Sequence, residues 1–250
     1  MKKYLIAAVL FFTLLPVLHT VNVSAAEEPD QPLSGWVKEE KKTFYYNDGK
    51  AVKGWQKIHK KWYFFDKKTK ALKRNCIAGD KAGGWYYVDD DGVRCGNKTM
   101  KLAVKAVRKY SKAKDKPVKR LYSCFRYFVK NYRYRSGGYK VSAKELPSFA
   151  KEFLLTKGGN CYRGAAALAY CAKALGFEAR IGVGGKSKKE IVHGWTEVKI
   201  GKKWYYYDIN RQRMNSHMKM YKLSVKKKPF GLVKNKDWDL TVSSGKVKWK

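Results

Sequence analysis

The sequence predicts an α+β protein in which a module of β-hairpins precedes a domain of helices and strands. Three features predict this architecture: an aromatic repeat over residues 35–95, helical spacing of apolar residues from 98 to 155, and an alanine-rich helix followed by strand-like runs from 161 to 210. We therefore expect the hairpin module to cover residues 35–97 and the mixed domain to cover residues 98–250.

The N-terminus has the pattern of a secretory signal peptide over residues 1–26. Two lysines precede an apolar run from Tyr4 to Val21, and the small residues up to Ala26 suit cleavage. An uncleaved membrane anchor is the alternative, but Pro16 interrupts the run, and the run is short for a bilayer span. We expect residues 27–34 to be a linker, and the mature chain to be secreted without a stable membrane span.

The hairpin module is predicted from its repeated aromatic segments. GWVK at 35–38 returns as GWQK at 54–57, and FYYN at 44–47 returns as YFFD at 63–66 and, more loosely, as YYVD at 86–89. Each unit has a tryptophan strand, a basic turn and an aromatic strand, a pattern typical of successive hairpins. Because one hairpin is too small to be stable alone, neighbouring units must stack and bury their rings.

The segment after the repeats predicts helices with one buried face. Residues 98–112 and 117–132 carry apolar side chains at helical spacing, and residues 146–155 form a third helical or irregular segment. We interpret these apolar stripes as core.

A further helix is predicted after Gly159, with Asn160 as its N-cap, Cys161 in its first turn and Gly176 beyond its C-terminus. The stretch is apolar around most of its circumference, so we expect it to be buried. The helix dipole and the free N–H groups of the first turn stabilise a thiolate at Cys161. Alternatively, Cys161 is a small core residue, as we expect for Cys171.

The chain then predicts a strand at 177–183 and a hairpin of 191–200 and 203–210 around Gly201-Lys202, a type II′ turn. In a two-residue turn Ile200 faces Lys203, and counting outward places His193 opposite Asn210 and Trp195 opposite Asp208. His193 and Asp208 are then diagonal neighbours on one face, about 7–8 Å apart at Cα. A loop one residue longer or shorter would place them on opposite faces.

Taken singly, His193 could be a satisfied core histidine and Asp208 a residue at the end of a strand. Together with Cys161 they supply the nucleophile, base and orienting acid that acyl transfer requires.

The segments 159–168, 193–198 and 204–208, in this order, resemble the cysteine, histidine and aspartate segments of the transglutaminase-like superfamily. The resemblance covers the second half of the chain and implies a transglutaminase-like core of the papain-like cysteine-protease type.

It also implies roles: Cys161 as nucleophile, His193 as general base and acid, and Asp208 as the group that orients the imidazole. The family includes transglutaminases, cysteine peptidases, amidases and inactive members, so it does not choose the reaction. We expect a secreted, wall-associated enzyme that cleaves or cross-links amides, with no metal or organic cofactor; a catalytically inactive wall-binding or adhesion protein is the alternative.

The aromatic repeats resemble the Gly-Trp cell-wall-binding repeats of Gram-positive surface proteins, including choline-binding modules. In choline-binding members, rings of adjacent repeats form a cage for a quaternary ammonium group. The alternative is that the rings are simply the core of the hairpins. The candidate ligand residues are Trp36, Tyr45, Trp55, Trp62, Tyr63, Trp85 and Tyr86.

The net charge of +36 predicts polyanionic surroundings. For a secreted chain we expect anionic wall polymers such as teichoic acid, with peptidoglycan and surface proteins as further partners, and we do not expect nucleic acid. A generally basic surface without one specific partner fits equally well.

Five cysteines leave one free if the others pair. Cys76–Cys95 with Cys124–Cys171 is one arrangement that leaves Cys161 free, and a fully reduced chain is another.

Overall fold

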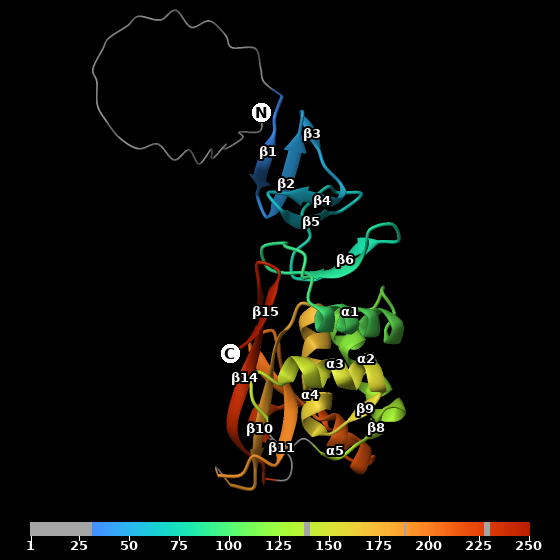
Figure 1. The fold of residues 1–250 in the computed structure, drawn as a ribbon, viewed down its shortest axis with the longest axis vertical. Coiled ribbons are helices and arrows are strands. Elements are labelled where there is room, and N and C mark those ends of the chain that lie inside the picture. Colours follow the sequence, from blue (N-terminus) through green and yellow to red (C-terminus); the bar gives the residue numbers. More distant parts are fainter. Residues whose placement is uncertain (1–31, 138–140, 188, 228–230) are drawn as a thin grey trace, which may run out of the picture.

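The computed structural model describes residues 32–137, 141–187, 189–227 and 231–250, and Figure 1 shows their fold. The predicted signal peptide and most of the predicted linker lie outside the described residues. Among the described residues, no helix combines the length and apolar character needed to cross a membrane.

The repeat segment folds as successive antiparallel hairpins. A three-stranded sheet of β1, β2 and β3 is followed by the pairs β4–β5 and β6–β7. In the first pair Trp36 lies opposite Tyr45, and in the second Trp55 lies opposite Phe64. The strands are β1 (Gly35–Glu39), β2 (Lys42–Asn47), β3 (Lys50–Ala51), β4 (Gly54–Ile58), β5 (Lys61–Phe65), β6 (Cys76–Asp80) and β7 (Gly84–Val88).

The helices follow the predicted positions closely. The side chain of Asn97 accepts from the Met100 N–H and starts the first helix, and Pro117 starts the second, where its missing N–H costs nothing. The helices are α1 (Lys98–Tyr110), α2 (Pro117–Asn131), α3 (Leu146–Thr156), α4 (Cys161–Ala174) and α5 (Ile209–Met214).

The mixed domain contains an antiparallel sheet in the order β13-β12-β11-β10-β14-β15. Helices α1 to α4 lie on one side of this sheet, and α4 packs against β10 and β11 (Figure 1). The sheet strands are β10 (Glu178–Gly185), β11 (His193–Ile200), β12 (Lys203–Tyr207), β13 (Tyr221–Ser224), β14 (Val233–Ser243) and β15 (Lys246–Trp249). A short parallel pair, β8 (Arg133–Tyr134) with β9 (Gly158–Gly159), precedes α4.

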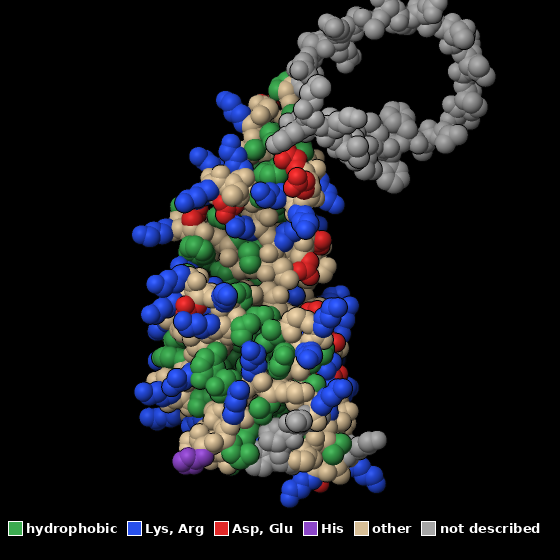
Figure 2. All heavy atoms as spheres, turned by 180° about the vertical axis from the view of Figure 1, so that it is seen from behind, with side chains coloured by type: hydrophobic (Ala, Val, Ile, Leu, Met, Phe, Trp, Pro, Cys, Tyr) green, Lys and Arg blue, Asp and Glu red, His purple; other side chains and the backbone are tan. Residues whose placement is uncertain are grey.

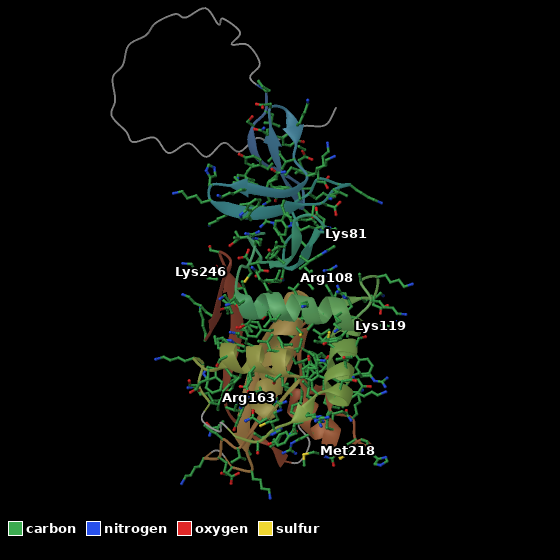
Figure 3. The ribbon with its side chains drawn as sticks, turned by 45° about the vertical axis from the view of Figure 1, so that its right-hand side comes forward. Lys81, Arg108, Lys119, Arg163, Met218 and Lys246 are labelled. Atoms are coloured by element: carbon green, nitrogen blue, oxygen red, sulfur yellow. The ribbon has the colours of Figure 1, made fainter. Side chains whose placement is uncertain are left out.

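The third hairpin packs against the mixed domain. Tyr87 is fully buried in the same core as α1 and α4, and the guanidinium of Arg108 on α1 lies 4.2 Å from the ring centroid of Trp85. The Asp89 carboxylate accepts a hydrogen bond of 2.8 Å from the Gly245 N–H in the β14–β15 turn. Figure 3 shows Arg108 at this junction between the repeats and the helices.

One expectation differs from the structure, and one open alternative is decided by it. The strand expected to reach Asn210 ends at Tyr207, because Asp208 caps α5 by accepting from the Arg211 N–H at 2.9 Å. All five cysteines are free thiols, which corresponds to the fully reduced alternative; neither Cys76–Cys95 nor Cys124–Cys171 is bridged. That pairing depended on counting cysteines, which carries no information about sulfur geometry.

Candidate active site

The N-terminus of α4 is held by Asn160. Its side-chain oxygen accepts from the Arg163 N–H at 3.2 Å, and its amide nitrogen donates to the Gly137 carbonyl at 2.7 Å. Cys161 is the first residue of α4 and is 9% exposed. The first N–H groups of a helix have no partner within the helix, so a negative charge at this sulfur is stabilised.

The β11–β12 hairpin has the predicted register. Ile200 lies opposite Lys203 and Thr196 opposite Tyr207, and Gly201 has a φ of 60°, which glycine adopts without strain. This register brings His193 and Asp208 to the same side. The His193 Nε2 and the Asp208 Oδ2 are 2.5 Å apart, and both side chains are buried.

Strand β11 is fixed against α4 by contacts on either side of His193. The Thr196 hydroxyl donates to the Ala165 carbonyl at 2.9 Å, and the Tyr162 hydroxyl donates to the Ile191 carbonyl at 2.8 Å. Between them, Gly194 allows a close approach, because a Cβ there would lie 2.6 Å from the Tyr162 ring. The imidazole is thereby brought close enough to the Cys161 thiol for the two groups to interact.

Asp208 has two further donors that the sequence analysis did not identify. The Tyr206 hydroxyl donates to Oδ2 at 2.6 Å, and the Arg211 N–H donates to Oδ1. The sequence does contain a signal for Tyr206, since residues two apart on a strand share a face. These bonds hold the carboxylate in one orientation toward His193.

The electrostatics favour a charged imidazole. Burial opposes protonation of His193, but the Asp208 charge and hydrogen bond, with the hydrogen bond to Cys161, outweigh it and raise the pKa of His193 to about 9. Burial likewise opposes ionisation of Asp208, but the His193 charge and the hydrogen bonds from His193, Arg211 and Tyr206 lower its pKa. At neutral pH the two groups therefore form an imidazolium–carboxylate pair.

Cys171 shows the opposite environment for a thiol. A hydrogen bond with Cys124 and complete burial raise the pKa of Cys171 well above its ordinary value. Cys171 is therefore a neutral thiol in the core, as expected from the sequence.

A small cavity lies beside Cys161. A cavity of about 10 Å³, the size of one water molecule, adjoins Cys161 and is also bordered by Asn210 and Arg213. Exposed apolar residues lie next to the site in sequence and register: Tyr134 pairs with Gly159, and Val192 precedes His193. A larger groove of about 900 Å³ lies between α2 and the segment after α5, and its lining includes none of the three candidate residues.

The arrangement places a cysteine at the start of a helix and a buried histidine that is paired with a buried carboxylate. These are the residue types from which proteins build a nucleophile, a base and an orienting acid for acyl transfer. Among the described residues, no group of three His, Cys, Asp or Glu side chains is arranged to hold a metal ion.

The candidate ligand residues of the repeats fall into three environments. Trp36 meets Tyr45 and Tyr63 edge-on, with ring centroids 5.2 and 5.0 Å apart. Trp85 is covered by Arg108 of α1. The remaining rings surround the guanidinium of Arg94. They belong to Trp55, Trp62 and Tyr86.

Comparisons with known proteins divide the chain in the same way. Residues 104–209 match the family model "Transglutaminase-like superfamily", residues 33–76 match "Choline-binding repeat" and residues 80–93 match "Putative cell wall binding repeat". No curated protein matches the chain.

Two solved structures are similar to parts of the chain. The choline-binding domain of Spr1274 from Streptococcus pneumoniae is 31% identical over 27% of this chain and 100% of that domain, with a TM-score of 0.24. A protein titled a putative cysteine protease from Cytophaga hutchinsonii is 21% identical over 56% of this chain, with a TM-score of 0.40. This chain spans 43% of that protein's length.

Proposed function

We propose that this protein, whose chain combines a transglutaminase-like domain with choline-binding repeats, is a secreted, wall-associated enzyme that transfers acyl groups from peptide or glutamine amides. In this proposal Cys161 is the nucleophile, His193 the general acid and base, and Asp208 the orienting group. The observation that carries it is the 2.5 Å imidazole–carboxylate pair beside a cysteine at the start of a buried helix.

The first half-reaction forms a thioester. The Cys161 thiolate attacks the amide carbonyl carbon, and the negative charge that develops on the oxygen is met by the Cys161 N–H. The C–N bond then breaks as the imidazolium protonates the leaving amine. Since Asp208 engages Nε2 of His193, Nδ1 is the nitrogen left to carry this proton.

The second half-reaction decides the enzyme class. Water or an amine attacks the thioester, His193 accepts the proton of the attacking group, and Cys161 leaves as the thiolate. Water as the attacking group makes the protein a peptidase or amidase, whereas a lysine amine makes it a cross-linking transglutaminase.

Mass spectrometry of glutamine-containing peptides tests this proposal. We expect the wild type and the control variant Cys76→Ala, whose sulfur lies in β6, to change the peptides, and Cys161→Ala to leave them unchanged. A gain of one water indicates hydrolysis, and loss of ammonia with joined chains indicates transamidation. No change that depends on Cys161 would refute the enzyme and leave an inactive wall-binding or adhesion protein.

The repeats indicate binding to cell-wall components. We propose teichoic acid and peptidoglycan as these components, with surface proteins as further partners. The net charge of +36 and the Lys and Arg side chains spread along the length of the face shown in Figure 2 support attraction to an anionic polymer. The exposed ring of Trp36, with Tyr45 and Tyr63, is our candidate contact.

Sedimentation with purified cell walls tests the proposed binding of the repeats to wall polymers. Retention should fall steeply with salt and should be the same for Cys161→Ala as for the wild type. Trp36→Ala should weaken retention, and equal retention of this variant would refute the assignment of Trp36. N-terminal sequencing of the secreted protein should begin at Glu27.

A further inference from the structure

We propose that Arg94 fills one aromatic cluster of the repeats as an internal cation and thereby closes that cluster to quaternary ammonium ligands. The cluster consists of Trp55, Trp62 and Tyr86. The guanidinium carbon of Arg94 lies 5.7 Å from the Trp55 ring centroid, 5.0 Å from that of Trp62 and 4.7 Å from that of Tyr86.

The three rings have the composition and the geometry of a cation site. Cations are attracted to the faces of aromatic rings within about 6 Å of the centroid, and tryptophan is the strongest of these partners. Trp55 and Tyr86 stand at 89° to each other with centroids 5.6 Å apart, so they bound a space from two directions. A hydrogen bond of 3.2 Å from the Trp55 indole to the Gly84 carbonyl fixes one of these rings.

Arg94 is anchored in this position by its backbone. Its N–H donates to the Trp62 carbonyl at 2.8 Å, and the residue forms a β-bridge with Val88. The neighbouring residues Val93 and Cys95 are buried, so the chain cannot easily shift at this point. In the described part of the chain, no carboxylate forms an ion pair with Arg94, and the rings are the groups that face its charge.

The Arg94 guanidinium opposes the entry of an external cation for two reasons, and the ammonium of Lys101 on α1, 5.1 Å from the Tyr86 ring centroid, adds a second positive charge at this cluster. The guanidinium occupies the space between the rings, and its positive charge repels another positive charge at close range. By contrast, within the ranges that the structure describes, no lysine or arginine lies over Trp36, Tyr45 or Tyr63, and Trp36 is 42% exposed. The two clusters therefore differ in their capacity for an external ligand.

The inference rests on the binding half of the proposed function and is independent of catalysis. It predicts that an arginine selects which aromatic cluster of the module takes a ligand. Removing the Arg94 side chain should free the faces of Trp55 and Trp62 for trimethylammonium groups such as choline, while Lys101 stays over Tyr86.

Nuclear magnetic resonance of the tryptophan indole N–H groups in the full chain tests this inference, with choline chloride as the probe and sodium chloride as the ionic-strength control. In the wild type, choline should leave the Trp55 and Trp62 signals unmoved. In Arg94→Ala both signals should move, and equilibrium dialysis should find one additional choline per chain. The matched variant Arg94→Lys retains a cation and should behave as the wild type does.

Choline-dependent movement of the Trp55 or Trp62 signal in the wild type would overturn the inference. So would unmoved signals in Arg94→Ala when the dispersion of the other indole signals shows that the variant is folded. If Arg94→Ala does not fold, Arg94→Gln, which keeps a longer uncharged side chain, is titrated in its place. Cys161-dependent activity should be equal in all folded variants, which separates this test from that of the enzyme.

Discussion

Replacing Asp208 with asparagine should lower the pKa of His193 and destabilise the fold at neutral pH. The substitution preserves the shape of the side chain and removes the charge that faces the imidazole at 2.5 Å. In the wild type the carboxylate outweighs burial and raises the pKa of His193 to about 9. In the variant, burial, the largest single effect, is opposed only by the interaction with Cys161, so the pKa should fall below the ordinary value of about 6.5.

The size and sign of the stability change follow from linkage. A rise from 6.5 to about 9 corresponds to about 3 kcal/mol at about 1.4 kcal/mol per unit. Because the folded state holds the proton more tightly, this contribution is complete below pH 6.5 and is lost as the pH rises through 9. The lowered pKa of Asp208 reports the same His193–Asp208 interaction, so no further free energy is added for it.

The assay has two parts, a titration of the His193 ring by nuclear magnetic resonance and denaturant unfolding at pH 6 and pH 10. Asp208→Asn should lose about 3 kcal/mol of unfolding free energy at pH 6 and much less at pH 10. Asp91→Asn, which changes an exposed acid, is the control and should match the wild type. The reasoning is refuted if His193 in Asp208→Asn still titrates near 9, or if the loss is equal at both pH values.

Three other predictions concern the same site. The kcat/KM of the Cys161-dependent reaction should fall as the pH rises through about 9, because His193 loses the proton that the leaving amine needs; a flat profile to pH 10 would contradict this. Tyr206→Phe removes one donor to Asp208 and should cost about 2 kcal/mol in denaturant unfolding and lower kcat/KM about tenfold; unchanged values would remove its positioning role. Gly194→Ala should cost about 1–3 kcal/mol by thermal unfolding, whereas Gly96→Ala, which meets open space, should not; equal stability of the two would refute the close contact.

Local signals in the sequence were sufficient to predict much of the fold and the proximity of His193 to Asp208. Asn160 caps α4 because its side chain reaches an N–H three residues away, and Gly201 sets the register of the hairpin that joins His193 to Asp208. Both signals act over a few residues, so a single sequence displays them. The catalytic roles of Cys161, His193 and Asp208 stay predictions, as does the domain boundary at residue 97.

Other features depended on contacts between distant segments. Capping of α5 by Asp208 ended β12 three residues before the expected position, although strand periodicity continued the pattern. The chain also gave no indication that Asp89 would bind the Gly245 N–H, 156 positions away, and so attach the third hairpin to the sheet. Such contacts arise only when separate elements pack, and spacing along the chain does not encode them.

The amino-acid sequence by itself therefore determined the class of most elements up to Tyr207, the cap that presents Cys161 and the register that aligns His193 with Asp208, because hydrogen bonding and periodicity within a few residues decide these. Only the tertiary structure decided that Asp89 joins the third hairpin to the sheet and that Arg94 lies among Trp55, Trp62 and Tyr86. A side chain's partners in space depend on which surfaces meet after folding, and an arginine in a basic sequence gives no sign of the rings it will face.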